Sequence, residues 1–371
     1  MASLPQEPLG IPFSEVLRPE LTDLAAYAPH PGDFAIRLDA NEAPPLLSEA
    51  ARSRLAEVAQ QTAFARYPDA GLERLREALA SRSGVSPAEI LPGVGSDEII
   101  TLLLTALSQP RRGSDTVQIV TTTPTFVMYR MSAKVRGQRV LEVPLDENWD
   151  LSEAAMLSAL RVVEPSLVFI ASPNNPTSNQ VSRERLAKVI EAAPRSLVVI
   201  DEAYVDYSAE NQLELYKRYE NVAILRTLSK IGFAALRVGW LIARPEAVRE
   251  LDKVRLPYNL PTLSQTLGTL AVTELAPEIQ NTVRIVVRER ARLAERVAAL
   301  PNVVVTPSQA NFLWLRAERP AGELFDALSA RGILVRSFHS RGGRLANQLR
   351  VTIGTPEEND AFFDAYRSLV G

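Results

Sequence analysis

The 371-residue sequence contains no cysteine and only two histidines, His30 and His339. Without cysteine, the chain cannot form disulfides, thiolate metal sites, iron–sulfur clusters or a cysteine nucleophile. Two histidines that lie far apart in the sequence argue against a histidine-rich metal site and against a Ser-His-Asp triad. The sequence therefore favours chemistry that depends on neither residue type, and we expect no bound metal.

A strong excess of positive charge and long apolar runs are also absent. The formal net charge is −3 and the pI is about 5.7, whereas nucleic-acid-binding domains usually carry a basic excess. No stretch approaches the roughly 18 apolar residues of a membrane span. The first 12 residues lack the basic start and apolar run of a signal peptide. We therefore expect a soluble cytoplasmic protein with neither nucleic acid nor membrane as a partner.

Short apolar runs alternate with amphipathic stretches between residues 46 and 243. This alternation is typical of βαβ units, and it predicts an α/β fold with a mostly parallel sheet. Sheets of this kind bind ligands at the carboxyl ends of their strands. The expected strands are Val117–Thr121, Val140–Val143, Leu167–Ala171, Leu197–Ile200 and Val222–Leu225, and the expected helices are Asp97–Leu107, Thr125–Lys134, Ser152–Leu160 and Ser182–Ala193.

The pattern changes near Pro261, where two long helical stretches are followed by short strands and helices. This change predicts a second, smaller α+β domain. We expect three parts: an N-terminal arm over residues 1–40 that packs on the small domain, a large domain over residues 41–275, and a small C-terminal domain over residues 276–371.

A lysine follows the expected strand Val222–Leu225, in the stretch Arg226-Thr-Leu-Ser-Lys230. Small and apolar neighbours favour desolvation of Lys230, and a neutral amine can attack a carbonyl to form an imine. Ser229 and Arg237 offer the hydroxyl and the bidentate cation that bind a phosphate. The alternative is a surface loop in which Arg237 forms a salt bridge.

Two further polar segments follow expected strands. Asp201 ends an apolar run, where an unpaired carboxylate is costly and a ring N–H would stabilise it. Asn175 lies in a loop with two prolines, which is typical of a ligand-facing turn. Asp201 acting as a cap, Glu202 acting as a general acid and an ordinary turn at Asn175 remain open as alternatives.

A glycine-containing stretch, Gly93-Val-Gly-Ser-Asp-Glu98, leads into an expected helix. Glu98 occupies the third glycine position of a dinucleotide fingerprint, so the indication of NAD is weak. Because free N–H groups at a helix N-terminus suit a single phosphate, we expect Ser96 and Asp97 to bind one.

Eight motifs in this order resemble the histidinol-phosphate aminotransferases, a family of fold type I enzymes that use pyridoxal phosphate (PLP). The resemblance covers nearly the whole chain. The motifs are Leu38-Asp-Ala-Asn-Glu-Ala-Pro44, Arg66-Tyr-Pro-Asp69, Gly95-Ser-Asp-Glu98, Pro124-Thr-Phe126, Ser172-Pro-Asn-Asn-Pro-Thr177, Asp201-Glu-Ala-Tyr204, Thr227-Leu-Ser-Lys230 and Leu349-Arg-Val-Thr-Ile-Gly-Thr355. Ala43 and Ser178 depart from the residues usual in the family, and neither belongs to the PLP set.

The resemblance implies a PLP site made of a catalytic group and a set of binding residues. Lys230 is then the Schiff-base lysine, Asp201 pairs with the pyridine nitrogen, and Asn175 and Tyr204 hold the ring oxygen. Phe126 stacks on the ring. The phosphate is held by Ser96, Asp97, Ser229 and Arg237, and by Tyr67 from the other subunit of a homodimer with shared active sites.

The resemblance also implies a substrate. Arg350 binds a carboxylate, Arg336 and Tyr27 bind the substrate phosphate, and Asn41 completes the substrate-binding set. The expected reaction is amino transfer from L-histidinol phosphate to 2-oxoglutarate in histidine biosynthesis. The alternatives are an aromatic or broad-specificity aminotransferase, a phospho-amino-acid decarboxylase of the same fold, an NAD-dependent oxidoreductase, and a regulatory protein that uses the fold as a ligand sensor.

Overall fold

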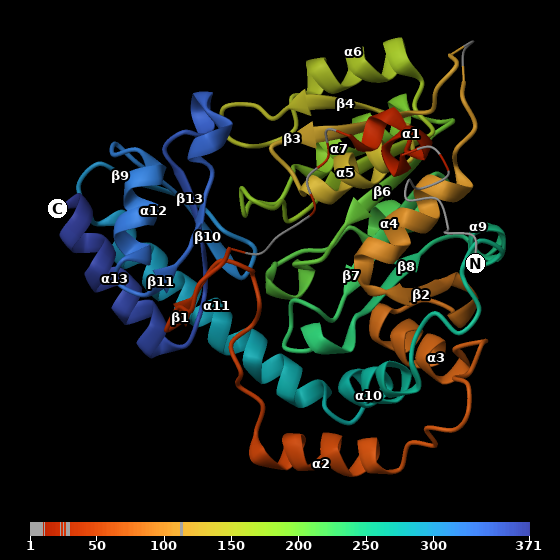
Figure 1. Cartoon of the computed structure of the whole chain (residues 1–371), viewed down its shortest axis with the longest axis horizontal. Coiled ribbons are helices and arrows are strands. Elements are labelled where there is room, and N and C mark those ends of the chain that lie inside the picture. Colours follow the sequence, from red (N-terminus) through yellow and green to blue (C-terminus); the bar gives the residue numbers. More distant parts are fainter. Residues whose placement is uncertain (1–9, 11, 23, 25, 27–29, 112–113) are drawn as a thin grey trace, which may run out of the picture.

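The computed structural model describes residues 10, 12–22, 24, 26, 30–111 and 114–371. A seven-stranded sheet forms the centre of the larger part of the molecule, on the right in Figure 1, with strand order β2-β8-β7-β6-β5-β3-β4. Only the pairs that β8 forms with β2 and with β7 are antiparallel. The strands are β2 Ile90–Val94, β3 Gln118–Thr123, β4 Arg139–Pro144, β5 Leu167–Ala171, β6 Leu197–Asp201, β7 Val222–Thr227 and β8 Val238–Ile242. The predicted α/β fold with a mostly parallel sheet is confirmed.

Strand β2 was not predicted, because Pro92 and Gly93 are residue types that strands disfavour. Proline has no backbone N–H group, so in a central strand it leaves a neighbouring strand without one hydrogen bond. Strand β2 lies at the edge of the sheet, where that loss is tolerated. The expected helix over Asp97–Leu107 begins two residues earlier, at Gly95, and ends at Ala106.

Helices cover both faces of this sheet, as the continuous apolar strands require. Alternate residues of one strand enter different cores: Phe169 packs with Ile99 and Tyr129, whereas Val168 and Ile170 pack on the opposite face. The helices of this part are α2 Glu49–Gln60, α3 Glu73–Ser83, α4 Gly95–Ala106, α5 Val127–Val135, α6 Glu153–Val163, α7 Arg183–Ala192, α8 Leu213–Arg218, α9 Pro245–Asp252 and α10 Thr262–Val272. Helix α2 packs on α10, away from the sheet (Figure 1).

A second sheet of four strands, in the order β12-β13-β10-β9, lies on the left in Figure 1. All of its neighbouring strands are antiparallel. The long helix α11 extends from the region of α10 to this sheet. The elements of this part are α11 Ala276–Ala298, β9 Val303–Thr306, β10 Phe312–Ala317, α12 Ala321–Ser329, β11 Ile333–Leu334, β12 Arg336–Ser337, β13 Gln348–Thr352 and α13 Pro356–Val370.

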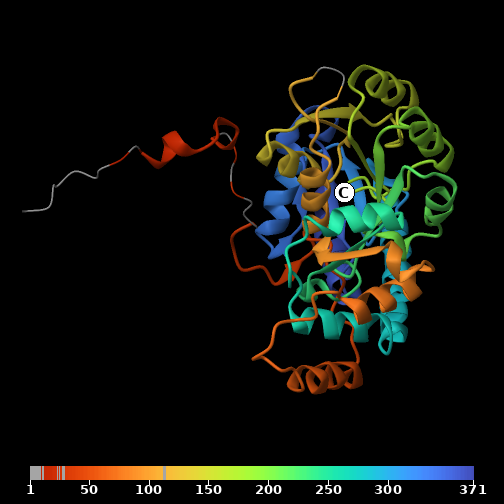
Figure 2. The same cartoon turned by 90° about the vertical axis from the view of Figure 1, so that its right-hand side faces the viewer.

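The N-terminal segment contacts two different parts of the molecule. Strand β1 (Ile36–Arg37) pairs in parallel with β11, next to the four-stranded sheet. The short 3₁₀ helix Pro19–Leu21 lies beside α5, where the Arg18 guanidinium donates to the carbonyl of Val135. Helix α1 (Phe13–Val16) extends away from the body of the protein (Figure 2). Among the helices of the described ranges, none is long and apolar enough to cross a membrane.

Candidate active site

A cavity of about 270 Å³ lies where the carboxyl ends of β5, β6 and β7 approach the N-terminus of α4 and the strands β12 and β13. Of the fourteen residues expected to form the site, twelve line this cavity. They are Asn41, Ser96, Asp97, Phe126, Asn175, Asp201, Tyr204, Ser229, Lys230, Arg237, Arg336 and Arg350. Residues that lie more than 300 positions apart in the sequence therefore meet in one cavity.

Asp201 is the last residue of β6 and is only 4% exposed. Its Oδ2 atom accepts a hydrogen bond from the Tyr129 hydroxyl at 2.6 Å, and its Oδ1 atom accepts from the amide of Ala203 at 2.9 Å. Burial raises the pKa of Asp201 to about 6, although both hydrogen bonds favour the charged form. Asp201 is thus a buried carboxylate that a cationic ligand would stabilise.

Lys230 lies in the loop after β7, and its side chain is half-buried. Its Nζ atom is 3.5 Å from the carbonyl oxygen of Ala40. The backbone carbonyl of Lys230 accepts a hydrogen bond from the buried Tyr207 hydroxyl, which fixes the loop. The amine therefore points into the cavity from a rigid support. Each of the other lysines of the chain lies outside the set of residues that line it.

The N-terminus of α4 and the strand β8 come unusually close together. A Cβ atom on Gly239 would lie 2.6 Å from the Ser96 amide nitrogen, and one on Gly95 would lie 2.6 Å from Nη2 of Arg237. Gly95 also has a φ of +72°, which glycine adopts without strain. Only glycine at these two positions leaves the cradle between the helix end and the Arg237 guanidinium open.

Four polar groups surround this cradle. Arg237 donates to Oγ of Ser229 at 3.3 Å and to Oδ2 of Asp97 at 3.2 Å. The Ser229 hydroxyl also accepts from Thr227 at 2.9 Å. The Arg237 guanidinium, the Ser229 hydroxyl and the free N–H groups at the start of α4 supply donors suited to one phosphate group, whereas the Asp97 carboxylate orients the guanidinium.

Asn175 and Tyr204 bind residues that belong to distant segments. Asn175 accepts a hydrogen bond from Nη1 of Arg350 at 2.6 Å, and the Tyr204 hydroxyl accepts from Nδ2 of Asn41 at 3.0 Å. Asn41 has a φ of 56°, a left-handed conformation that asparagine tolerates. Its backbone N–H donates to Oγ1 of Thr352. The segment after β1 is thereby fixed between β13 and the cavity.

Arg336 and Arg350 are register partners on the antiparallel strands β12 and β13. Both side chains line the cavity, Arg336 exposed and Arg350 buried. Arg336 forms no ion pair with any residue in the described part of the chain. Like charges in directly opposed positions repel each other, so this end of the cavity favours anionic ligands.

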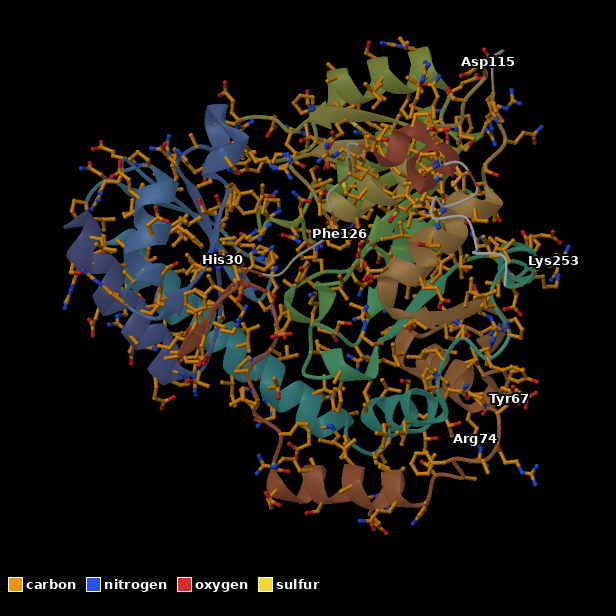
Figure 3. The ribbon with its side chains drawn as sticks, viewed as in Figure 1. His30, Tyr67, Arg74, Asp115, Phe126 and Lys253 are labelled. Carbon is orange, nitrogen blue, oxygen red and sulfur yellow. The ribbon has the colours of Figure 1, made fainter. Side chains whose placement is uncertain are left out.

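Two expected residues are not brought into the cavity. Tyr27 lies outside the described residues. Tyr67 is 81% exposed at the periphery of the molecule, far from Phe126 and His30 near its centre (Figure 3), and it stacks on Tyr258 with ring centroids 4.7 Å apart. Within one chain, Tyr67 therefore does not belong to the site, and its expected role stays a prediction.

The cavity also includes residues that the sequence did not reveal, among them Tyr129, His30, Phe338 and Arg341. The one feature of the sequence that could have indicated Tyr129 is its position, three residues after Phe126 at the start of a helix. Glu202, considered above as a general acid, faces elsewhere. It is 1% exposed, and its Oε2 atom accepts from Nε and Nη2 of Arg226, at 2.8 and 2.7 Å, outside the cavity.

Comparison with known proteins gives consistent results. Residues 35–365 match the model of the family described as aminotransferase class I and II. The chain is 39% identical over 361 residues to histidinol-phosphate aminotransferase 2 of Nitrosococcus oceani, covering 95% of this chain and 96% of that protein. It is also 39% identical to histidinol-phosphate aminotransferase of Chromobacterium violaceum, covering 96% and 98%. The crystal structure of the Sinorhizobium meliloti histidinol-phosphate aminotransferase in complex with pyridoxal-5'-phosphate superposes with a TM-score of 0.83 at 23% identity, covering 96% and 98%.

Proposed function

This chain belongs to the aminotransferase class I and II family, and we propose that it transfers the amino group of L-histidinol phosphate to 2-oxoglutarate with PLP as its cofactor. The products are imidazole acetol phosphate and glutamate, and the reaction serves histidine biosynthesis in the cytoplasm. The curated relatives named above support this choice of substrate. The observation that carries it is the pair Arg336 and Arg350, two opposed cations that line one end of the cavity.

The residues around the cavity fit PLP. The cradle at the start of α4, which a Cβ atom on Gly239 or Gly95 would fill, suits its phosphate. Asp201 would accept a hydrogen bond from the protonated ring nitrogen, and Tyr204 and the side-chain amide of Asn175 would donate to the ring oxygen. Phe126 lines the cavity, edge-on to Tyr129 with centroids 5.6 Å apart, and offers a ring face to the cofactor.

Bound PLP supplies a carbonyl for the donor amine and an electron-withdrawing ring that stabilises negative charge at the substrate Cα. The protein supplies proton transfer and orientation. Lys230, whose amine lies near the Ala40 carbonyl, would hold the cofactor and would act as the acid and base that moves a proton at the substrate Cα. Asp201 keeps the ring nitrogen protonated, and burial of its carboxylate strengthens that interaction.

The two arginines serve the two half-reactions differently. Histidinol phosphate carries a phosphate and lacks an α-carboxylate, whereas glutamate carries two carboxylates. We assign Arg350, next to Asn175, to the α-carboxylate of glutamate, and Arg336, at the mouth of the cavity, to the distal phosphate. Guanidinium groups bind both anions in a bidentate manner.

We also propose that the active unit is a homodimer with shared sites. Large apolar side chains are exposed around Tyr67: Phe64 is 79% exposed, Leu256 is 70% exposed and Tyr258 is 43% exposed. Helix α1 extends from the body with Phe13 exposed (Figure 2). A second copy of the chain would cover these surfaces and bring Tyr67 to the neighbouring cofactor phosphate.

The same proposal assigns the division of the chain: an arm over residues 1–40, a PLP-binding domain over residues 41–275 and a smaller domain over residues 276–371. The site then lies between the two domains, because Arg336, Phe338, Arg341 and Arg350 come from the second and most of the other cavity residues from the first. The residues expected to hold the cofactor all precede residue 276, and the two arginines expected to bind the substrate both follow it.

Substrate profiling tests the function. The kcat/KM for L-histidinol phosphate should exceed the values for histidinol and for aromatic amino acids, and turnover should require 2-oxoglutarate. Similar values for phosphorylated and unphosphorylated donors would favour a broad-specificity aminotransferase. Release of CO₂ without an oxo-acid acceptor would favour a decarboxylase, since Lys230 and Asp201 serve both reactions.

A further inference from the structure

Tyr129 is a residue of α5 whose hydroxyl lies inside the cavity wall and touches no solvent. Its side chain is 0% exposed, and its ring stacks on Phe169 of β5 with centroids 4.9 Å apart and planes within 4°. The hydroxyl donates to Oδ2 of Asp201 at 2.6 Å. The phenol is thus held rigidly by the sheet and is directed at one oxygen of one carboxylate.

We propose that Tyr129 is a positioning residue that makes Asp201 less basic and so keeps the proton of the cofactor on the ring nitrogen rather than on the carboxylate. This inference rests on the proposed PLP chemistry. A proton between a pyridine nitrogen and a carboxylate resides on the more basic partner. A hydrogen bond that Oδ2 of Asp201 already accepts lowers its basicity, and the proton then remains on the ring, where it promotes charge delocalisation from Cα.

The surroundings of Asp201 show why such a donor is needed. Burial raises the pKa of this carboxyl, and the nearby Asp97 raises it further. The Tyr129 hydroxyl, the Ala203 amide and the charge of Lys230 lower it. Of these groups, Tyr129 and the Ala203 amide donate directly to the carboxylate and favour its charged form.

Tyr129 itself does not supply a proton. Burial, and the negative charge of Asp201, raise the pKa of its phenol well above the ordinary value. The hydroxyl therefore stays protonated at neutral pH and remains a donor to Asp201. This property distinguishes a positioning role from a role as a general acid, which needs a pKa near the working pH.

The first experiment uses the ligand-free protein. The ionisation of Asp201 is followed by infrared difference spectroscopy, with the Asp201→Asn variant subtracted, in wild type and in Tyr129→Phe. The variant keeps the ring on Phe169 and lacks only the hydroxyl. The midpoint should rise by about one to two pH units, because a hydrogen bond to a charged group has this strength. An unchanged midpoint would overturn the proposal.

The second experiment uses protein loaded with PLP that is labelled with ¹⁵N in the ring. The ¹⁵N chemical shift should report a protonated ring in wild type and a shift towards the unprotonated form in Tyr129→Phe. The kcat should fall about ten- to hundredfold while the KM for the amino donor changes little. A protonated ring in the variant together with a normal kcat would contradict the positioning role.

Two further variants serve as controls. Tyr366→Phe removes another buried phenol, one whose hydroxyl has no hydrogen-bond partner in the described ranges, and it should change neither measurement. Replacement of Tyr129 by 3,5-difluorotyrosine gives a stronger donor and should lower the Asp201 midpoint. If wild type fails to bind PLP, the proposed function is wrong, whereas the ligand-free titration still decides whether Tyr129 controls Asp201.

Discussion

Arg336 of β12 and Arg350 of β13 face each other as register partners at one end of the cavity. Arg350 already donates to Asn175 and to the carbonyl of Asp39. Arg336, in contrast, is exposed. Two adjacent guanidinium groups with such different surroundings are suited to bind two different anions. The buried Arg350 suits the α-carboxylate, which every amino-acid substrate carries.

The first prediction concerns this pair. Arg336→Ala should raise the KM for histidinol phosphate roughly ten- to hundredfold, the loss expected for a charge-assisted hydrogen bond. The KM for aromatic amino acids should change little. Arg350→Ala should impair the half-reaction with glutamate most. Steady-state kinetics of each half-reaction measure both effects.

Arg319→Ala is a matched control, since Arg319 pairs with Glu323 on the surface of α12, away from the cavity. It should leave every constant unchanged. Equal losses for phosphorylated and unphosphorylated donors in Arg336→Ala would reject the phosphate site at Arg336.

The second prediction concerns the stability of the ligand-free protein. The folded-state pKa of Asp201, about 6, lies above its ordinary value of 3.8, so the folded state binds the proton more tightly than the unfolded state does. The unfolding free energy should therefore fall as the pH rises from about 4 to 6, by up to about 3 kcal/mol for this group. Above this pH range the buried carboxylate of Asp201 stays charged, so the destabilisation remains.

Asp201→Asn should remove this pH-dependent loss. The ligand-free variant should be more stable than wild type at pH 7–8, and the difference should vanish near pH 4. The gain should be smaller than the full value, because one amide oxygen must replace two carboxylate oxygens for Tyr129 and Ala203. Urea unfolding at several pH values measures it, and parallel pH profiles for the two proteins would show that Asp201 is not the cause.

Much of this site could be predicted because its residues follow apolar runs. Asp201 ends β6 and Lys230 lies three residues after β7, and both strands have side chains that pack on both sides, so the place of these two residues at the carboxyl edge follows from parallel pairing. The cradle was less visible. Its shape depends on the approach of Gly239 to the backbone of Ser96, which lies 143 residues earlier in the chain.

Contacts between side chains of different elements could not be read from the sequence. The hydrogen bond from Tyr129 to Asp201 depends on how α5 packs on the sheet. The positions of Arg341 and His30 at the cavity depend on how the second sheet and the segment before β1 lie against the first. Strand β2 was missed for a similar reason, since it relies on its position at the edge of the sheet to accommodate Pro92.

The third prediction concerns the dimer. If Tyr67 completes the site of the partner subunit, Tyr67→Ala and Lys230→Ala should each have low activity as homodimers. A mixed dimer of the two variants contains one intact site, so random mixing should restore about a quarter of wild-type activity. Activity after mixing, unfolding and refolding of the two proteins measures this recovery. No recovery, or full activity in a monomer by sedimentation, would contradict shared sites.

The central claim is that PLP is bound in this cavity by Lys230, and one measurement tests it most directly. The chain has five lysines: Lys134, Lys188, Lys217, Lys230 and Lys253. Borohydride reduction of the PLP-loaded protein, followed by peptide mass spectrometry, identifies the lysine that carries the pyridoxyl group. We expect the label on Lys230 alone, together with loss of visible absorbance and of turnover in Lys230→Ala. A label on another lysine, or turnover near the wild-type rate in Lys230→Ala, would contradict the assignment.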